Sequence, residues 1–273
     1  MHAIFDTHCH YNLSPLSDNW ETHWQNAQNR DITQSIVVGT TLESSKQALE
    51  IANQNKHMFA AVGIHPNEVT NKTDNTPQSI LTSNEKSKTN KKNIVAIGET
   101  GLDYFRMGND SQAQKDMQKD AFVAHLQIAQ EHNLPVILHV RDKHTPEEKT
   151  PGNAYWDTVE ITQDYPNLQY ILHCFSGPSQ YVSLMVSRGA YVGVAGNITY
   201  PSARALRSIL ETVPKERILL ETDAPYLPPQ QHRGQTCEPY MIRHTGEFLE
   251  SEMNVSLKKI YENTLQCFKI YTL

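Results

Sequence analysis

The stretch PVILHVRD at residues 135–142 shows the pattern that decides the fold. Its apolar part is rich in Val, Ile and Leu and lacks the polar alternation of a half-exposed strand. This is typical of a strand that is buried on both faces of a parallel sheet. Two ionisable residues, His139 and Arg141, stand where the run ends. The stretch therefore indicates a buried parallel strand with reactive side chains at its carboxyl end.

Seven further runs of this kind occur along the chain, and the segments between them are long enough for a helix. Eight strand–helix units predict an α/β fold, the (β/α)8 or TIM barrel, and we expect a single domain over residues 1–273. A doubly wound open sheet competes with this prediction, but no Gly-rich dinucleotide turn follows the first run. The expected strands are 3–5, 35–39, 59–64, 94–98, 135–140, 170–175, 190–196 and 218–223.

The segments between the runs support this architecture. Residues 256–271 are expected to form the closing helix. Residues 111–132 predict a helix with one apolar stripe. The residues of this stripe are Met117, Ala121, Ala124 and Ile128.

Two polar stretches, near residues 70–93 and 144–152, are interpreted as surface insertions in the barrel. The first is rich in Asn, Lys, Thr and Ser, and only Ile80 and Leu81 provide an anchor in the core. We expect part of it to be a mobile loop.

The composition narrows the function classes. Asp and Glu total 30 against 24 Lys and Arg, so no overall basic field draws the chain to nucleic acid, and any contact with DNA has to be local. The four cysteines form no C-x-x-C pair, which argues against a disulfide framework or a zinc ribbon. No apolar run approaches the roughly 20 residues that span a bilayer, and residues 1–10 lack the pattern of a secretory signal. We expect a cytoplasmic protein with no membrane contact and no obligate protein partner.

Ionisable residues gather at the ends of six of the expected strands. In a closed parallel barrel the carboxyl ends of all strands meet at one mouth, where barrel enzymes carry their active sites. Residues far apart in the sequence are therefore expected to meet there. These residues are Asp6, His8, His10, His65, Glu99, Asp103, His139, Arg141, His173 and Asp223.

His8 and His10 are two residues apart, so in a strand both imidazoles face the same side and can share one metal ion. Taken alone, an H-x-H pair is more often a surface accident than a metal site. A lone His139 or His173 beside apolar residues is likewise more often a hydrogen-bonded core residue. Four histidines and two carboxylates at equivalent strand ends are harder to explain in this way, because burying so much charge requires a compensating cation.

A ligand set of imidazole and carboxylate suits zinc, manganese, nickel or cobalt better than calcium. The one neighbouring thiol, Cys174, is expected to point away from the barrel axis into the core, because strand alternation separates it from His173. The candidates exceed what one tetrahedral ion needs, so we expect two divalent ions, roughly 3.5–4 Å apart and bridged by a carboxylate. The residues do not distinguish Zn, Mg, Mn, Co and Ni. The candidate ligands are His8, His10, Glu99, His139, His173 and Asp223.

Six blocks of the chain resemble the signature blocks of the TatD-like metal-dependent deoxyribonucleases, a family of the amidohydrolase-like barrel superfamily. The resemblance runs in order over nearly the whole chain, and it implies a (β/α)8 barrel of the metal-dependent hydrolase type. The blocks are FDTHCH (5–10), GIHP (63–66), GETGLDY (98–104), PVILHVRD (135–142), LHCFSG (172–177) and ETDAPYLPP (221–229).

The resemblance also implies roles for these residues. It implies that His65 lies near the scissile phosphate and that Arg233 belongs to a block after the last strand. The chain departs from the family pattern at Asn67, where a second histidine often follows GIHP, and at Thr100, where an aliphatic residue is commoner. Neither departure removes a metal ligand. The implied ligands are His8, His10 and Asp223 for one ion and His139 and His173 for the other, with Glu99 as the bridge.

These observations predict a metal-dependent hydrolase that cleaves phosphodiester bonds in DNA, exonucleolytically at single-stranded or frayed ends. Two ions would activate water and stabilise the charge that develops in line. Asp223 is the candidate to accept the proton of the water, and Glu99 and His65 complete the expected catalytic set.

Five residues are candidates for binding substrate. His65 and Arg141 can hold phosphate, although a pairing of Arg141 with Asp142 or Asp103 is nearly as well supported. Aromatic side chains near the mouth can stack on a base, but such residues are more often packing. The substrate-binding candidates are His65, Arg141, Tyr104, Tyr226 and Arg233, and Phe105 is a further aromatic residue at this position.

Two other function classes compete with a nuclease. A small-molecule amidohydrolase or lactonase uses the same two-metal barrel, but its carboxylated lysine has no counterpart here, because the fourth run supplies Glu99 and no strand end offers a lysine. A non-catalytic binding barrel is expected to have lost one or more ligands, and none is missing here.

Overall fold

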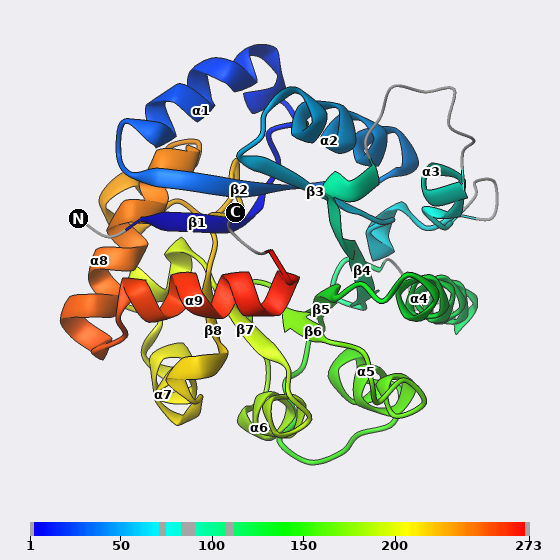
Figure 1. Cartoon of the computed structure of the whole chain (residues 1–273). Helices are drawn as coiled ribbons and strands as arrows, with labels where there is room; N and C mark the ends of the chain where they lie inside the picture. Colours follow the sequence, from blue (N-terminus) through cyan, green and yellow to red (C-terminus); the bar gives the residue numbers. More distant parts are fainter. Residues whose placement is uncertain (1–2, 71–74, 83–90, 108–111, 271–273) are drawn as a thin grey trace.

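Eight parallel strands form a ring at the centre of the computed structural model, which describes residues 3–70, 75–82, 91–107 and 112–270 (Figure 1). Each strand pairs with the next in sequence order, from β1 to β8. This confirms the (β/α)8 barrel and excludes the doubly wound sheet. The strands are β1 (Ile4–Cys9), β2 (Ile32–Val38), β3 (Met58–Val62), β4 (Ile94–Asp103), β5 (Val136–Arg141), β6 (Tyr170–Leu172), β7 (Tyr191–Val194) and β8 (Ile218–Leu220).

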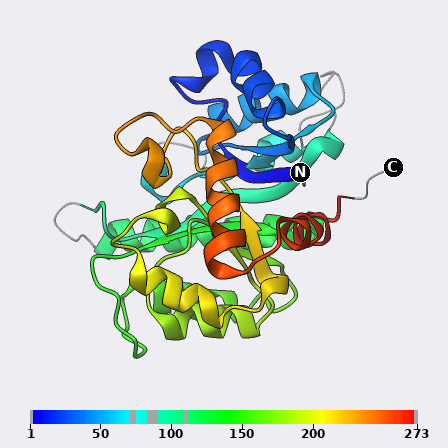
Figure 2. The same cartoon turned by 90° about the vertical axis from the view of Figure 1, so that its left-hand side faces the viewer.

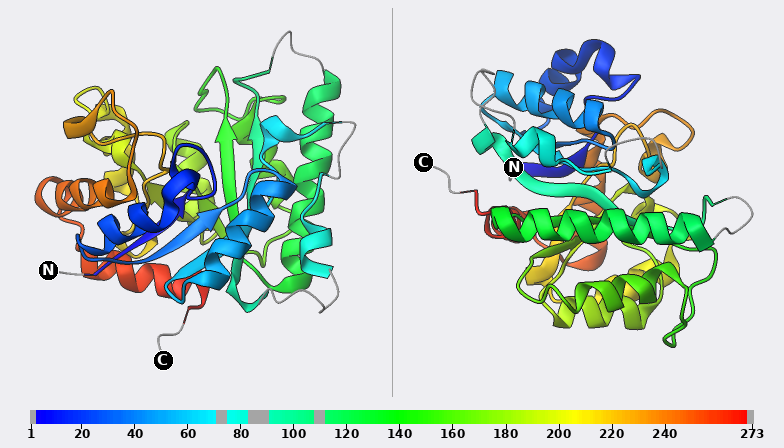
Figure 3. Two further views of the ribbon diagram at one scale, coloured as in Figure 1. Left: turned by 90° about the horizontal axis from the view of Figure 1, so that it is seen from above. Right: turned by 90° about the vertical axis from the view of Figure 1, so that its right-hand side faces the viewer.

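Helices surround this ring, as Figure 2 and the two views of Figure 3 show. None in the described part of the chain has the length and apolar character needed to cross a membrane. The helices are α1 (Trp20–Gln28), α2 (Leu42–Gln54), α3 (Gln78–Thr82), α4 (Gln112–His132), α5 (Ala154–Thr162), α6 (Ser179–Ser187), α7 (Arg204–Thr212), α8 (Ile242–Met253) and α9 (Leu257–Phe268).

The barrel has two apolar layers because successive side chains of a strand point to opposite faces. In β5, Val136 and Leu138 pack outward against the helices, and Ile137 packs inside the ring. The inner layer takes residues from every strand, and Cys267 and Phe268 at the end of α9 belong to it. A barrel core of this kind is filled and leaves no pore. The layers explain why the strands lack polar alternation.

The seam between β1 and β8 is held by polar groups near the mouth. His10 N–H donates to Ala224 O (2.8 Å), and Asp223 N–H donates to His8 O (2.9 Å). Below them the buried Asp6 carboxylate accepts hydrogen bonds from the backbone N–H of Thr222 (3.0 Å), from its hydroxyl (2.7 Å) and from His8 N–H (3.2 Å). Closure of the ring thus fixes the positions of His8 and His10 relative to Asp223, all three of which are predicted metal ligands.

Strands β1 and β4 extend several residues beyond their predicted carboxyl ends. We expected Asp6, His8, Glu99 and Asp103 to follow their strands, but they lie within β1 and β4. The parallel pairing includes these parts of the chain, since it reaches Cys9 in β1 and Asp103 in β4, with register shifts on the way. Polar side chains are tolerated inside these strands because they contact one another at the barrel mouth.

The connecting segments match their predictions in part. The stripe on α4 is confirmed in part: Ala121 and Ile128 are buried as predicted, but Met117 and Ala124 are half-buried, and Phe122 and Leu126 are buried in addition. Of the first insertion, Ile80 is buried in the core and Leu81 packs against it, as predicted. The expected mobile loop falls largely on residues 71–74 and 83–90, outside the described residues. The second insertion, residues 144–152, contains no helix or strand.

Asp6 gives the seam a dependence on pH. Burial raises the pKa of its carboxyl group from 3.8 to about 7, although hydrogen bonds from Thr222 and His8 oppose this shift. A carboxyl group whose pKa is higher in the folded state binds its proton more tightly there. The protein is therefore stabilised by Asp6 less and less as the pH rises from about 4 to about 7. Over this range the free energy of unfolding falls by up to about 4 kcal/mol.

Asp6→Asn cannot ionise and therefore escapes this loss. We expect the stability of the variant relative to the parent to improve between about pH 4 and pH 7 and then to level off. Urea unfolding of both proteins at several pH values, with a chelator present so that metal binding does not contribute, measures this difference. A difference that stays constant with pH would contradict the role assigned to Asp6.

Candidate metal centre

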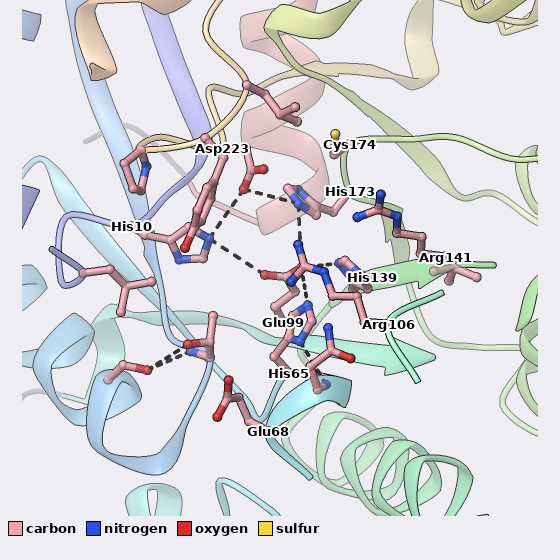
Figure 4. A pocket seen from close by; sticks show the side chains of 18 of the residues that line it. His10, His65, Glu68, Glu99, Arg106, His139, Arg141, His173, Cys174 and Asp223 are labelled. Carbon is pink, nitrogen blue, oxygen red and sulfur yellow. Dashed lines mark hydrogen bonds and ion pairs between the residues drawn. The ribbon is translucent and has the colours of Figure 1, made fainter. Parts of the chain in front are cut away.

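The six predicted ligands converge at the mouth of the barrel, and Figure 4 shows all of them except His8. They line or lie directly beneath a pocket of about 910 Å³, near the upper end of the roughly 300–1,000 Å³ usual for ligand sites. Five of the six lie between 0 and 9 % exposed, and the His139 side chain is 18 % exposed. The ligands come from β1 (His8), the residue after β1 (His10), β4 (Glu99), β5 (His139) and the segments after β6 (His173) and β8 (Asp223).

The donor atoms of His8, His10 and Glu99 form one compact group, and an oxygen of Asp223 lies next to both imidazoles. His8 Nε2 lies 3.2 Å from His10 Nε2, 3.5 Å from Glu99 Oε2 and 3.8 Å from Asp223 Oδ1. His10 Nε2 is 3.8 Å from the same Glu99 oxygen and 3.5 Å from the same Asp223 oxygen. Ligand bonds of about 2.1 Å place tetrahedral donors about 3.4 Å apart. These residues therefore fit one divalent ion.

The other carboxylate oxygen of Glu99 faces a second group. Glu99 Oε1 lies 2.7 Å from His139 Nδ1, 3.6 Å from His65 Nε2 and 3.7 Å from His173 Nε2. His173 Nε2 also lies 3.5 Å from Asp223 Oδ1, so it stands between the two groups. A carboxylate whose two oxygens face separate sets of imidazoles has the geometry of a bridging ligand.

Neighbouring groups orient two of the imidazoles. His10 Nδ1 lies 2.9 Å from Val38 O, which can only accept, so Nδ1 carries the proton and the Nε2 lone pair faces the site. His173 Nδ1 lies 3.0 Å from the buried Glu221 carboxylate. A Cβ atom on Gly193 would stand 2.4 Å from Glu221 Oε2, so this carboxylate requires a glycine beside it. Such outer contacts fix both the tautomer and the angle of a ligand.

His65 has the opposite arrangement. Its Nδ1 accepts a hydrogen bond from Asn67 N–H (3.1 Å), so the neutral ring carries its proton on Nε2, which faces Glu99. Burial lowers the pKa of His65 to about 3, although Glu99 opposes this, and the ring is neutral at pH 7. A protonated Nε2 donates a hydrogen bond and has no lone pair for a metal. His65 is therefore better suited to contact a substrate than to bind an ion, although its distances alone place it among the possible ligands.

Asp103 supports the second group from below. Its Oδ2 accepts a hydrogen bond from Asn67 Nδ2 (2.8 Å) and lies 3.3 Å from His139 Nε2. Its Oδ1 accepts the backbone N–H groups of Phe105 and Arg106, both at 3.0 Å. The carboxylate is buried, and although burial alone would raise its pKa, these hydrogen bonds and His139 hold it well below its usual range. Asn67 thus helps to hold His139 through Asp103.

Carboxylates and imidazoles at the site shift one another's pKa. Burial favours the neutral form of Glu99, but His65 and His173 hold its pKa well below the usual range. Burial likewise disfavours the charged form of His173, but Glu221, Glu99 and Asp223 raise its pKa to about 10. Against the effect of burial, the carboxylates thus draw protons onto His10, His139 and His173, whereas burial lowers the pKa of His8 and His65. A divalent cation would replace these protons, because ligands must be deprotonated to bind metal.

The predicted substrate residues lie at different places. Arg141 and Tyr226 line the pocket, and Arg233 does not: it is exposed, with its guanidinium 4.9 Å from the centre of the Tyr200 ring. The placement of Tyr104 at the mouth is wrong, because this side chain is 2 % exposed and its hydroxyl donates to Asp157 Oδ2 at 3.0 Å.

Two further expectations need correction. In the described structure Arg141 pairs with neither Asp142 nor Asp103, and its guanidinium lies 4.0 Å from the centre of the Phe105 ring. Cys174 is half-buried and lines the pocket, whereas we expected it in the core. Its φ of 43° places it in a left-handed turn after β6, where strand alternation no longer applies.

Sequence reasoning assigned no role to two residues that matter at this site. Glu221 contacts His173, and its position two residues before Asp223 at a strand end was the available indication. Arg106 projects into the pocket, with its Nε 4.0 Å from Asp103 Oδ2 (Figure 4). Nothing in the sequence separates it from any other surface arginine.

A parallel (β/α)8 barrel with buried imidazoles and carboxylates at its carboxyl mouth defines a metal-dependent hydrolase. The model of the TatD related DNase family matches residues 5–271 of the chain. The chain belongs to this family and is a metal-dependent hydrolase.

Individual relatives agree with this assignment. The uncharacterized metal-dependent hydrolase YabD of Bacillus subtilis is 29 % identical, over 98 % of this chain and 99 % of its own length. The 3'-5' ssDNA/RNA exonuclease TatD of Escherichia fergusonii is 33 % identical, over 78 % of this chain and 75 % of its own. The crystal structure of YjjV, a TatD homolog from Escherichia coli, superimposes with a TM-score of 0.84 and 27 % identity, over 98 % of both chains.

Glu99→Gln tests the bridging geometry. The amide keeps the shape of the side chain but loses the negative charge that lets two cations lie close together. We expect a folded variant that binds fewer metal ions per chain than the parent and loses more hydrolase activity than the roughly 10- to 100-fold typical of removing an outer contact of a ligand. Elemental analysis after dialysis against metal, together with circular dichroism, measures both properties.

Glu68→Gln is the matched control, because Glu68 lines the same pocket and none of the interactions above involves it. This variant should keep the metal content of the parent. Two ions per chain and near-parental turnover in Glu99→Gln would show that Glu99 is not a bridge.

Proposed function

We propose that the protein hydrolyses phosphodiester bonds of DNA at single-stranded or frayed ends, with two divalent metal ions. The observation that carries this proposal is the position of Glu99, whose two carboxylate oxygens face separate groups of imidazoles at the floor of an open pocket. Two ions held there would lower the pKa of a water molecule and neutralise phosphate oxygens, which is the usual chemistry of paired metals in phosphoryl transfer.

The side chains around the ions have distinct tasks. Asp223, 9 % exposed at the floor of the pocket, is the proposed acceptor for the proton of the attacking water. His65 donates a hydrogen bond from its Nε2–H to a phosphate oxygen, since its Nδ1 already accepts a hydrogen bond. Arg106 and Arg141 supply positive charge at the wall of the pocket, where the substrate backbone would enter.

The charge distribution favours a phosphodiester over an amide or a lactone. The chain carries a formal charge of −6, yet the described residues that line the pocket include two arginines beside the metal ligands. No lysine lines this pocket in the described part of the chain, so a carboxylated lysine between two metals has no source there. All six candidate ligands are present, which speaks against a barrel that only binds.

The choice of single-stranded DNA agrees with the name of the Escherichia fergusonii relative, which is a 3'-5' exonuclease for single-stranded DNA and RNA. We therefore propose nucleic acid as the substrate and assign the protein no other partner.

Metal removal is the direct test. We expect exhaustive chelation to abolish cleavage of a single-stranded oligonucleotide and addition of manganese, cobalt or magnesium to restore it. A gel assay with a labelled strand, run with each metal and with single-stranded and blunt duplex ends, measures the activity. Full activity after chelation would exclude the metal mechanism, and cleavage of amides or lactones without phosphodiesters would favour the competing hydrolase class.

Affinity for DNA should depend only weakly on salt. If Arg106 and Arg141 are the main phosphate contacts, the logarithm of the binding constant should fall against the logarithm of salt with a slope of about −1.4, at about −0.7 for each contact to a single strand. Fluorescence anisotropy of a labelled strand, with chelator present to prevent cleavage, gives this slope. A much steeper slope would indicate an extensive basic surface that these two arginines do not provide.

A further inference from the structure

Two large apolar side chains are exposed in the described part of the chain, and both lie at the mouth of the barrel. Tyr226 is 53 % exposed and lines the pocket, and Phe105 is 44 % exposed and lies against Arg141, which also lines it. An exposed aromatic ring elsewhere on a surface needs no explanation. Two such rings beside one catalytic pocket indicate a binding surface.

The two rings lie on opposite sides of the metal ligands. Phe105 follows β4 and Arg141 ends β5, whereas Tyr226 follows β8. Because the ring of strands runs in order from β1 to β8, the pair β4–β5 lies across the mouth from the pair β8–β1. The Glu99 carboxylate and the imidazoles lie between them. A strand that crosses the mouth over the ions would pass both rings.

Both rings are held by backbone contacts next to site residues. Phe105 N–H donates to the buried Asp103 carboxylate at 3.0 Å, and Tyr226 N–H donates to Asp223 O at 2.8 Å. The Tyr226 ring stands edge-on to the His10 ring, with centres 6.1 Å apart. Anchoring of this kind positions a flat side chain before the substrate binds, so less conformational entropy is lost on binding.

The Phe105 side of the mouth has a second flat group. The Arg141 guanidinium lies over the Phe105 ring at 4.0 Å and has no carboxylate partner among the described residues. An arginine stacked in this way keeps its N–H donors free for phosphate, and its plane can take part in stacking with a base. Tyr226 offers an aromatic face without a charge.

We infer that these groups form two base-stacking subsites: Tyr226 on one side of the scissile phosphate, and the Phe105–Arg141 pair on the other. The inference rests on the proposed function and makes its substrate more specific. Each ring needs a base that has left the duplex, so the shortest good substrate has two unpaired nucleosides that flank the bond to be cut. A blunt duplex end has to fray before it binds.

The test pairs ring-removing variants with abasic substrates. Phe105→Leu and Tyr226→Leu keep an apolar side chain but remove the ring. On a single-stranded oligonucleotide each should raise KM by about 5- to 100-fold, the range for loss of one base–aromatic stack, and the loss should fall mainly on KM because neither ring touches the reacting atoms. Tyr226→Phe should recover most of the binding lost in Tyr226→Leu.

Oligonucleotides with a single abasic residue on either side of the scissile bond assign each ring to one base. Removal of the base that stacks on Tyr226 should make Tyr226→Leu no worse than the parent, while Phe105→Leu still raises KM. The other abasic substrate should give the reverse. Phe248→Leu is the matched control. This ring on α8 also has an arginine beside it, with the Arg207 guanidinium 5.9 Å from its centre, but it is not among the described residues that line the pocket. This variant should leave KM unchanged.

The outcomes separate the two claims. If the parent cleaves oligonucleotides but the Leu variants keep its KM on every substrate, the stacking subsites do not exist and the proposed function stands. If both variants raise KM equally on all substrates, including the abasic ones, the rings act through the fold and the inference is likewise overturned. If the parent hydrolyses bis(p-nitrophenyl) phosphate but no oligonucleotide, the choice of DNA as substrate fails and the subsites fail with it.

Discussion

Closure of the barrel between β1 and β8 is the constraint on which the metal centre depends. Four ligand atoms can surround one ion only if the first and last strands of the ring lie side by side at the mouth. The bonds from His10 N–H to Ala224 O and from Asp223 N–H to His8 O hold them there, and the buried Asp6 carboxylate holds Thr222 one residue before Asp223. The hydrogen bonds that close the barrel therefore also position the candidate metal ligands.

The site gathers more buried charge than a barrel interior tolerates without compensation. Glu99 and Asp223 are buried among five imidazoles, and Asp103 and Glu221 add two further carboxylates behind them. Without a cation, this array can only share protons between its acids and bases. The two divalent ions that we propose would resolve this conflict, because each ion would neutralise carboxylates and accept imidazole lone pairs at the same time.

The mouth around this centre is asymmetric. The β4–β5 side carries Arg106, Arg141 and an exposed ring, and the β8 side carries Tyr226 among prolines. An acidic chain can still act on DNA if its positive charge is concentrated where the phosphate has to lie, because screening confines the effect of distant charges. Local contacts of this kind suit an enzyme that engages a short end rather than a long duplex.

The sequence by itself determined the barrel, its eight strands and the convergence of the six candidate ligands. These follow from local rules, since apolar periodicity marks buried strands and parallel order brings their carboxyl ends together. Only the tertiary structure decided which way individual side chains turn once the chain leaves a strand. Tyr104 and Phe105 are neighbours, yet one is buried against Asp157 and the other is exposed beside Arg141, because the Asp103 carboxylate binds the backbone that follows it. Contacts in turns or between residues far apart also decide the tautomer of His65, the position of Cys174 and the approach of Glu221 to His173. The spacing of apolar residues along the sequence does not predict such contacts.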